Sequence, residues 1–71
     1  MNKIIKQDAG GFIRLEYSEP NSYFLFARLF LTKPYELVGF NLDSPDQLIE
    51  QYNITLRNIS RYHGKEESIN D

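Results

Sequence analysis

The sequence contains no cysteine, which excludes disulfide bridges, thiolate metal ligands and a cysteine nucleophile. Its 71 residues allow one domain and no more, because domains rarely fall below about 50 residues. A chain of this length buries only roughly 60% of the surface that its unfolded form exposes. Without a disulfide, its core is therefore marginal unless a partner adds buried surface.

A surplus of positive charge is also missing, since 8 lysines and arginines stand beside 10 aspartates and glutamates. The net charge of −2 produces no overall field that would attract nucleic acid or an anionic membrane. The hydrophobic share of 41%, beside 25% charged residues, is ordinary for a globular protein and too apolar for a disordered one. We therefore expect a folded domain for which nucleic acid is a disfavoured partner.

Long apolar runs are absent as well. The longest stretch with few charges, residues 23–32, contains Arg28 and is far shorter than the ~20 residues that a membrane span requires. The start of the chain is basic but has no apolar stretch of the length that a signal peptide needs. We therefore expect a cytoplasmic protein that does not bind membranes.

Residues that carry catalysis are scarce. His63 is the sole histidine, and it lies near the predicted end of a helix, where an imidazole needs no special role. The sequence has no HxxxH pair, no Asp-rich loop with calcium spacing and no glycine-rich phosphate loop. We expect a protein that is not an enzyme and that binds neither a metal nor a cofactor.

A helix is predicted over residues 45–63. Ser44 is typical of the N-cap position, and Pro45 is typical of the first helical position. Apolar residues repeat at spacings of three and four and form one stripe, which comprises Leu48, Ile49, Tyr52, Leu56, Ile59 and Tyr62. Ile54 falls outside this stripe and is expected to be exposed. Gly64 is typical of the residue after the last helical turn, so we expect the helix to end there.

The rest of the chain alternates β-prone runs with turn formers. The runs cover residues 3–7, 12–17, 23–32 and 35–42. The connections are short, which suits an antiparallel meander, because a parallel pair needs a longer crossover. The sequence thus predicts an α+β fold, a sheet of three or four strands with one C-terminal helix packed on one face. We place a single domain at residues 1–64 and a polar, frayed tail at residues 65–71; whether residues 3–7 join the sheet stays open.

One helix covers one face of a sheet, so the second face indicates what else the protein contacts. Alternate side chains of a strand point to opposite faces. The predicted helix-facing set is largely aliphatic and comprises Ile13, Leu15, Tyr17, Tyr23, Leu25, Ala27, Leu29, Leu31, Tyr35, Leu37 and Gly39. The opposite face receives all five phenylalanines with other residues between them, namely Phe12, Phe24, Phe26, Phe30, Phe40, Val38, Arg14, Glu16, Arg28 and Glu36. An apolar patch of that size is typical of a binding surface.

We interpret this second face as the contact surface of a small non-enzymatic protein-interaction module, which would be an adaptor, inhibitor or regulator. The module would bury the face on itself or on a protein target. A homodimer is expected, because burial of several phenylalanines offsets the small core. The predicted partner-binding residues are five aromatic ones and two arginines that orient the partner at the rim: Phe12, Phe24, Phe26, Phe30, Phe40, Arg14 and Arg28.

Two structural alternatives stay open for this face. A bend or bulge in the strand predicted over residues 23–32 would turn some of the phenylalanines toward the helix. The N-terminal segment would, in the other alternative, fold over the face as a lid. In either case the phenylalanines belong to the core rather than to an interface.

Two other modes of binding also stay open. Aromatic sheet faces stack the bases of single-stranded nucleic acid, although Arg14 and Arg28 are matched here by Glu16 and Glu36. An edge strand of so small a sheet would also pair with a strand of a partner. Pro34 and the N-terminal lysines are typical of blocked edges and disfavour that mode.

Overall fold

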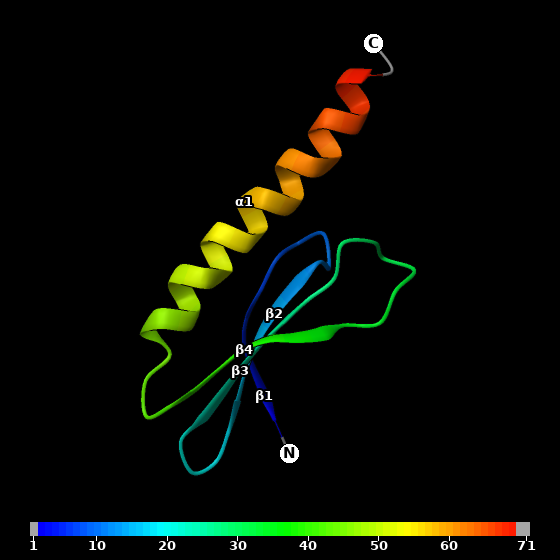
Figure 1. The fold of residues 1–71 in the computed structure, drawn as a ribbon. Coiled ribbons are helices and arrows are strands. Elements are labelled where there is room, and N and C mark those ends of the chain that lie inside the picture. Colours follow the sequence, from blue (N-terminus) through cyan, green and yellow to red (C-terminus); the bar gives the residue numbers. More distant parts are fainter. Residues whose placement is uncertain (1, 70–71) are drawn as a thin grey trace.

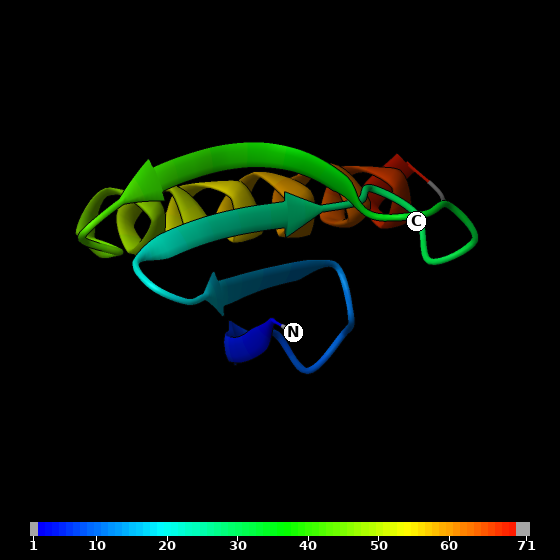
Figure 2. The same cartoon turned by 90° about the horizontal axis from the view of Figure 1, so that it is seen from below.

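Four strands and one helix make up the structure, a computed structural model that describes the backbone of residues 2–69 and the side chains of residues 2–64. The elements are β1 (Lys3–Gln7), β2 (Ile13–Ser18), β3 (Ser22–Ala27), β4 (Glu36–Leu42) and α1 (Asp46–Ile69). The strands form one antiparallel sheet in the order β1-β2-β3-β4, and α1 packs on one face of it (Figure 1). Figure 2 shows the strands side by side, with α1 extended in roughly the same direction. The predicted α+β meander is confirmed, with residues 3–7 as one of its strands.

The helix α1 begins as predicted but ends later. Ser44 Oγ accepts a hydrogen bond from the Asp46 backbone N–H at 3.2 Å, which caps the first turn. The expected end at Gly64 is wrong, because α1 continues to Ile69. A glycine ends a helix by adopting positive φ, and among the glycines of the described residues only Gly11 does so. The last two residues of the predicted tail, 70 and 71, lie outside the described residues, and the boundary between domain and tail stays a prediction.

The core lies between α1 and the middle of the sheet. Its buried cluster comprises Ile13, Leu15, Leu25, Ala27, Leu48 and Tyr52. The strand residues of this cluster are those predicted to face the helix. Tyr52 is 3% exposed, and the pKa of its phenol is raised above the usual 10.0 by burial first, with further contributions from Asp8 and Tyr35. Ile54 is exposed, as predicted.

The strand β3 is shorter than predicted, because it ends at Ala27 instead of residue 32. The Arg28 backbone N–H donates to the Phe12 carbonyl at 2.8 Å. A turn then follows, in which the Lys33 N–H donates to the Phe30 carbonyl at 3.1 Å. The strict alternation of faces therefore stops at Ala27, and the residues beyond it occupy a loop.

A register shift in β4 overturns the predicted alternation at its start. Leu25 pairs with Gly39, whereas the next residue of β3, Phe26, pairs with Leu37. Val38 is therefore an extra residue in a bulge. Leu37, which was predicted to lie beneath the helix, shares the other face of the sheet with Phe26.

Candidate interaction surface

The sheet face that α1 does not cover carries apolar side chains from three strands. We call this surface the open face and define it by Ile4, Phe24, Phe26, Leu37, Phe40 and Leu42. The exposed fractions of Ile4, Leu37, Phe40 and Leu42 lie between 51% and 55%. Phe24 is half-buried between its neighbours. The residues of β3 and β4 thus form one apolar surface in contact with solvent, and Ile4 lies on the other side of the β2 residue Glu16.

Phenylalanine rings occupy the centre of the open face. Phe24 of β3 lies directly opposite Phe40 of β4, and their ring centroids are 5.2 Å apart at an interplanar angle of 46°. The centroids of Phe24 and Phe26 are 6.4 Å apart, with rings inclined by 29°. Such cross-strand and same-face aromatic pairs stabilise a sheet. They also hold the three rings as one block.

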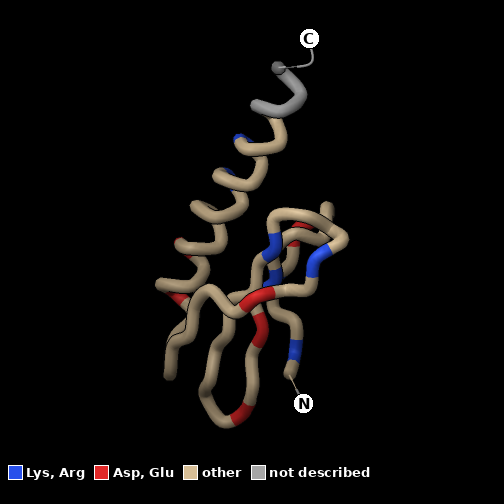
Figure 3. The backbone as a smooth tube through the Cα atoms, turned by 45° about the vertical axis from the view of Figure 1, so that its right-hand side comes forward, with Lys and Arg blue, Asp and Glu red and all other residues tan. Residues whose placement is uncertain are grey.

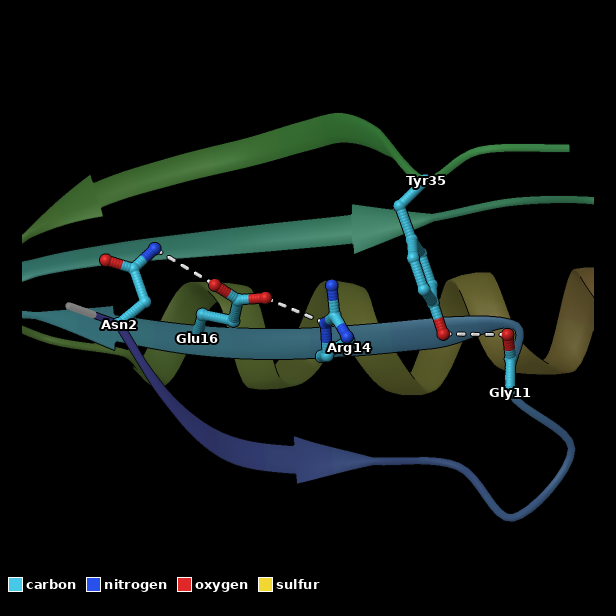
Figure 4. A network of polar contacts seen from close by, with 5 residues as sticks. All are labelled: Asn2, Gly11, Arg14, Glu16 and Tyr35. Carbon is cyan, nitrogen blue, oxygen red and sulfur yellow. Dashed lines mark hydrogen bonds and ion pairs between the residues drawn. The ribbon is translucent and has the colours of Figure 1, made fainter.

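A polar row runs along β2 beside this aromatic block. Arg14 Nε lies 2.7 Å from Glu16 Oε2, and the Asn2 side-chain amide donates to Glu16 Oε1 at 2.9 Å. Figure 4 shows this row on the near side of the sheet, with α1 behind the strands. Glu16 is only 9% exposed, yet each of its carboxylate oxygens has a partner. The ion pair thus compensates the charge of Glu16, while Arg14 Nε, despite its 2.7 Å distance to the carboxylate, has no hydrogen bond of good geometry among the described residues.

Tyr35 closes the row at the end of the sheet next to the β3–β4 loop. Its ring lies between two guanidinium groups, with Arg14 Cζ 4.5 Å and Arg28 Cζ 4.3 Å from the ring centroid. The Tyr35 hydroxyl donates to the Gly11 carbonyl at 2.8 Å, and Arg28 Nε donates to the same carbonyl at 2.8 Å. Tyr35 was predicted to face the helix. These contacts correct that prediction, because they join it to the row on the opposite face.

The predicted site residues divide into two groups. Phe24, Phe26, Phe40 and Arg14 lie on the open face, and Arg28 lies at its end beside Tyr35. The other two predicted contact residues, Phe12 and Phe30, do not lie on this face. The prediction that all five phenylalanines share one face is therefore wrong, while the role of each residue in partner binding stays a prediction.

Phe12 and Phe30 pack instead around His63 of α1. The centroid of the His63 ring is 5.2 Å from that of Phe12 and 6.0 Å from that of Phe30. Phe30 also meets Tyr62 edge-on, with centroids 6.0 Å apart. The physical reason is that both phenylalanines lie just outside the strands, where the chain turns and no sheet register directs the side chains. Through these contacts the β1–β2 loop, which contains Phe12, and the β3–β4 loop, which contains Phe30, pack against α1.

A groove of about 540 Å³ between the β1–β2 loop and α1 brings together Asp8 and His63. Asp8 accepts hydrogen bonds from the backbone N–H groups of Gly10, Phe12 and Ile13 at 3.1, 2.8 and 2.8 Å. The His63 Nε2 atom lies 2.8 Å from the Leu29 carbonyl oxygen. Both titratable groups therefore hold loop backbone in place.

Several members of the candidate surface carry no clear signal in the sequence. Ile4 and Asn2 belong to it because β1 pairs with β2, and Leu37 belongs to it because of the bulge at Val38. A bulge leaves no mark in the pattern of residue types. Leu42 shares this face with Phe40, because it lies two residues further along β4 and pairs with Ser22 without a shift.

Comparisons with protein-family models, with curated proteins and with solved structures give no match to this chain. Within the described residues, no three histidine, aspartate or glutamate side chains gather in a way that would hold a metal ion. Over the same part of the chain, no helix is both long and apolar enough to cross a membrane. The geometry of the chain itself is therefore the ground for a functional proposal.

Proposed function

We propose that this protein is a small non-enzymatic interaction module of the cytoplasm, an adaptor, inhibitor or regulator, and that it binds protein through its open face. The observation that carries this proposal is the apolar exposure of that face, where Phe40 and Leu37 are 52% and 55% exposed. Monomeric proteins rarely leave a contiguous apolar patch above a few hundred Å² in water, and larger patches mark interaction sites. The absence of cysteine suits the reducing compartment that we propose.

The polar row beside the aromatic block supports the same proposal. Covering an ion pair with a partner costs free energy unless the charged groups are already compensated. Glu16 is largely buried, with Arg14 and Asn2 on its two oxygens, so most of its desolvation has occurred before any partner arrives. Aromatic residues and arginine are also the types enriched in the energetically important parts of protein interfaces.

Single-stranded nucleic acid is the second candidate partner. The block of Phe24, Phe26 and Phe40 offers rings on which bases stack, and Arg28 has no ion pair within the described residues. The charge of Arg14, however, is neutralised by Glu16, and the chain as a whole carries −2. A phosphate backbone needs a surplus of cations, so protein is the better supported partner.

Photo-crosslinking inside the cells that make the protein tests this proposal. p-Benzoylphenylalanine replaces Phe40 in one variant and Ile54 in a control variant, because Ile54 is a similarly exposed apolar residue of α1. We expect position 40 to give adducts that protease removes and nuclease does not, and position 54 to give far fewer. Adducts sensitive to nuclease, or equal yields at the two positions, would contradict the proposal.

A further inference from the structure

We propose that the occupant of the open face is a second copy of this chain, packed face to face about a twofold axis so that the strands of the two copies run antiparallel. This inference rests on the proposed function, because it names the partner of the same surface. Three properties of the described residues support it: the area of the open face, the distribution of charge along the strands and the compensated state of Glu16.

The open face has enough area for a dimer interface. Ile4, Leu37, Phe40 and Leu42 are each slightly more than half exposed, and the bulged residue Val38, which follows Leu37 at the edge of the open face, is 47% exposed. A large side chain has about 200 Å² of surface, so these five expose on the order of 500 Å² per copy. Two copies would then bury on the order of 1,000 Å², which reaches the lower bound for a specific interface. In a twofold dimer the same surface of both copies forms the interface, so the open face alone supplies both sides of the contact.

Charge differs between the two ends of the open face. The end next to the β3–β4 loop has two cations, Arg28 and Lys33, which line one hollow of about 330 Å³ together with Glu36. Glu36 was predicted to lie on the phenylalanine face, but the bulge pairs it with the helix-facing Ala27. The opposite end has the exposed carboxylates of Glu19 in the β2–β3 turn and Asp43 after β4. Figure 3 shows most of the cationic segments of the sheet near the loops at one end, with acidic segments among them, and an acidic segment at the tip of the turn at the other end, where one cationic segment lies beside the N-terminus. The two cations at the loop end and the two carboxylates at the turn end give the sheet a basic and an acidic end, and Lys3 at the start of β1 partly offsets the acidic one.

The strand register places these two groups at opposite ends of the sheet. Ser22 pairs with Leu42 beside the acidic end, and Ala27 pairs with Glu36 beside the basic end. Asn21 joins the acidic groups, because its side-chain amide donates to the Asp43 carboxylate and its carbonyl accepts from the Asp43 backbone N–H. The distance between the ends is therefore fixed by the length of β3.

This charge distribution selects one of two twofold arrangements. If the axis runs across the strands, the strands of the copies are antiparallel and each basic end lies over an acidic end. If the axis runs along the strands, like ends meet, and like charges across an interface are unfavourable. The antiparallel arrangement therefore buries the apolar centres of both copies and also brings opposite charges together at the ends. It brings Lys33 of one copy toward the acidic end that Glu19 and Asp43 form on the other.

Polar groups in the middle of the face are compatible with this packing. An axis across the strands places β2 of one copy over β2 of the other, so the Arg14–Glu16 pair would face the same pair of the second copy in the opposite direction. Glu16 keeps Asn2 and Arg14 as partners, so no carboxylate is left unpaired when water is excluded. Tyr35 already holds the two guanidinium groups against its ring.

Sedimentation equilibrium of the purified chain, from micromolar to millimolar concentration at low salt, tests the inference. We expect a monomer–dimer equilibrium in the unmodified protein. Phe40→Asp, and separately Leu42→Asp, should weaken the dimer at least about 100-fold, because each dimer would bury two added charges. Ile54→Asp is the matched control on α1 and should change the dissociation constant by less than about twofold. Far-ultraviolet circular dichroism checks that each variant keeps its helix.

Charge reversal tests the antiparallel arrangement separately. Lys33→Glu and Glu19→Lys should each weaken the dimer about tenfold, and the double variant should recover most of that loss, because the exchanged charges face each other again. Glu50→Lys on α1 changes the net charge as Glu19→Lys does and should have no effect on the dimer.

The outcomes distinguish this inference from the proposed function. A monomer at every concentration would overturn the second copy as the occupant, while protein adducts at position 40 in cells would still support the proposed function. A dimer that is unaffected by Phe40→Asp would overturn the open face as its interface. A dimer that Phe40→Asp breaks, but that gains nothing from combining the two charge reversals, would overturn the antiparallel arrangement.

Discussion

Leu48 of α1 packs directly against Gly39 of β4. A Cβ atom built on Gly39 would lie 2.8 Å from Leu48 Cδ2 and 3.3 Å from the Cβ of Leu25. The first distance is too short for two carbon atoms in contact, so the absence of a side chain at this position lets the helix approach the sheet. The helix that leaves the open face uncovered is thus positioned in part by one glycine.

Gly39→Ala is therefore expected to destabilise the protein. The added methyl group forces Leu48 out of its position, and overpacking of a core costs about 1–3 kcal/mol in the free energy of unfolding. Gly64→Ala is the matched control, because nothing among the described residues lies within 4 Å of its Cβ position and alanine favours the helix by about 0.5–1 kcal/mol. Urea denaturation measures both. An unchanged midpoint for Gly39→Ala would refute the close packing of Leu48.

Asp8→Ala should destabilise the β1–β2 loop. The Asp8 carboxylate accepts hydrogen bonds from three backbone N–H groups, those of Gly10, Phe12 and Ile13. Their loss is expected to lower the free energy of unfolding by about 1–3 kcal/mol, because at least one of the donors is then left without a partner. Asp8→Asn keeps one acceptor oxygen and should lose less. Equal stability of the two variants in urea would speak against this account.

Tyr35, at the end of the polar row, contributes to the free energy of unfolding in two ways, through its hydroxyl group and through its ring. Tyr35→Phe removes the hydrogen bond to the Gly11 carbonyl but keeps the ring between Arg14 and Arg28, so we expect a loss of about 0.5–1.5 kcal/mol. Tyr35→Ala removes the ring as well and should lose about 1 kcal/mol more, because two cation–π contacts disappear. Thermal unfolding of the three proteins measures the difference. If the phenylalanine variant lost as much as the alanine variant, the ring contacts would contribute nothing.

Period-two alternation predicted the core correctly where the strands are regular. Ile13, Leu15, Leu25 and Ala27 lie beneath the helix because each of their strands continues without a shift through these positions. The alternation predicts the wrong face for Leu37, because the bulge at Val38 moves every earlier residue of β4 by one position. A one-residue shift in register exchanges the two faces of a strand, and no residue type in β4 signals it.

The phenylalanines illustrate the same limit at a strand end. Residues 28–32 are as β-prone as the strand before them, so the sequence predicts a strand through Phe30. The end of the strand is set by tertiary contacts: the Arg28 backbone pairs with Phe12, and the Arg28 side chain donates to the carbonyl groups of Gly11 and Lys33. The local β propensity of residues 28–32 cannot predict the bonds to Gly11 and Phe12, because these residues lie far earlier in the chain. The block of Phe24, Phe26 and Phe40, by contrast, follows from regular alternation and was predicted.

The stability of the protein should fall at high pH through Tyr52. Burial raises the pKa of Tyr52 in the folded state above the 10.0 of an exposed tyrosine. The unfolded chain therefore loses this proton first, and ionisation favours unfolding once the pH passes about 10. Below that pH the contribution of Tyr52 to the stability of the fold is fully present. This contribution is lost as the pH rises toward the pKa of Tyr52 in the folded state.

Comparison with Tyr52→Phe isolates this effect, because the other titrating groups are common to both proteins. The free energy of unfolding of the unmodified protein, minus that of the variant, should be constant up to about pH 9 and should decrease above about pH 10. Urea denaturation across this range supplies both values. A difference that stays constant to about pH 11.5 would show that the Tyr52 phenol is not desolvated in the folded protein.

Phe26 and Phe30 should respond differently to the same substitution, because one lies on the open face and the other packs against α1. Phe26→Ala is expected to weaken self-association, by about tenfold or more, while the helix signal in circular dichroism is kept. Phe30→Ala removes edge-on contacts with Tyr62 and His63. We expect it to lower the free energy of unfolding by about 1 kcal/mol and to leave association nearly unchanged. If Phe26→Ala abolished the helix signal together with association, Phe26 would belong to the core, and the open face would lose its central contact residue.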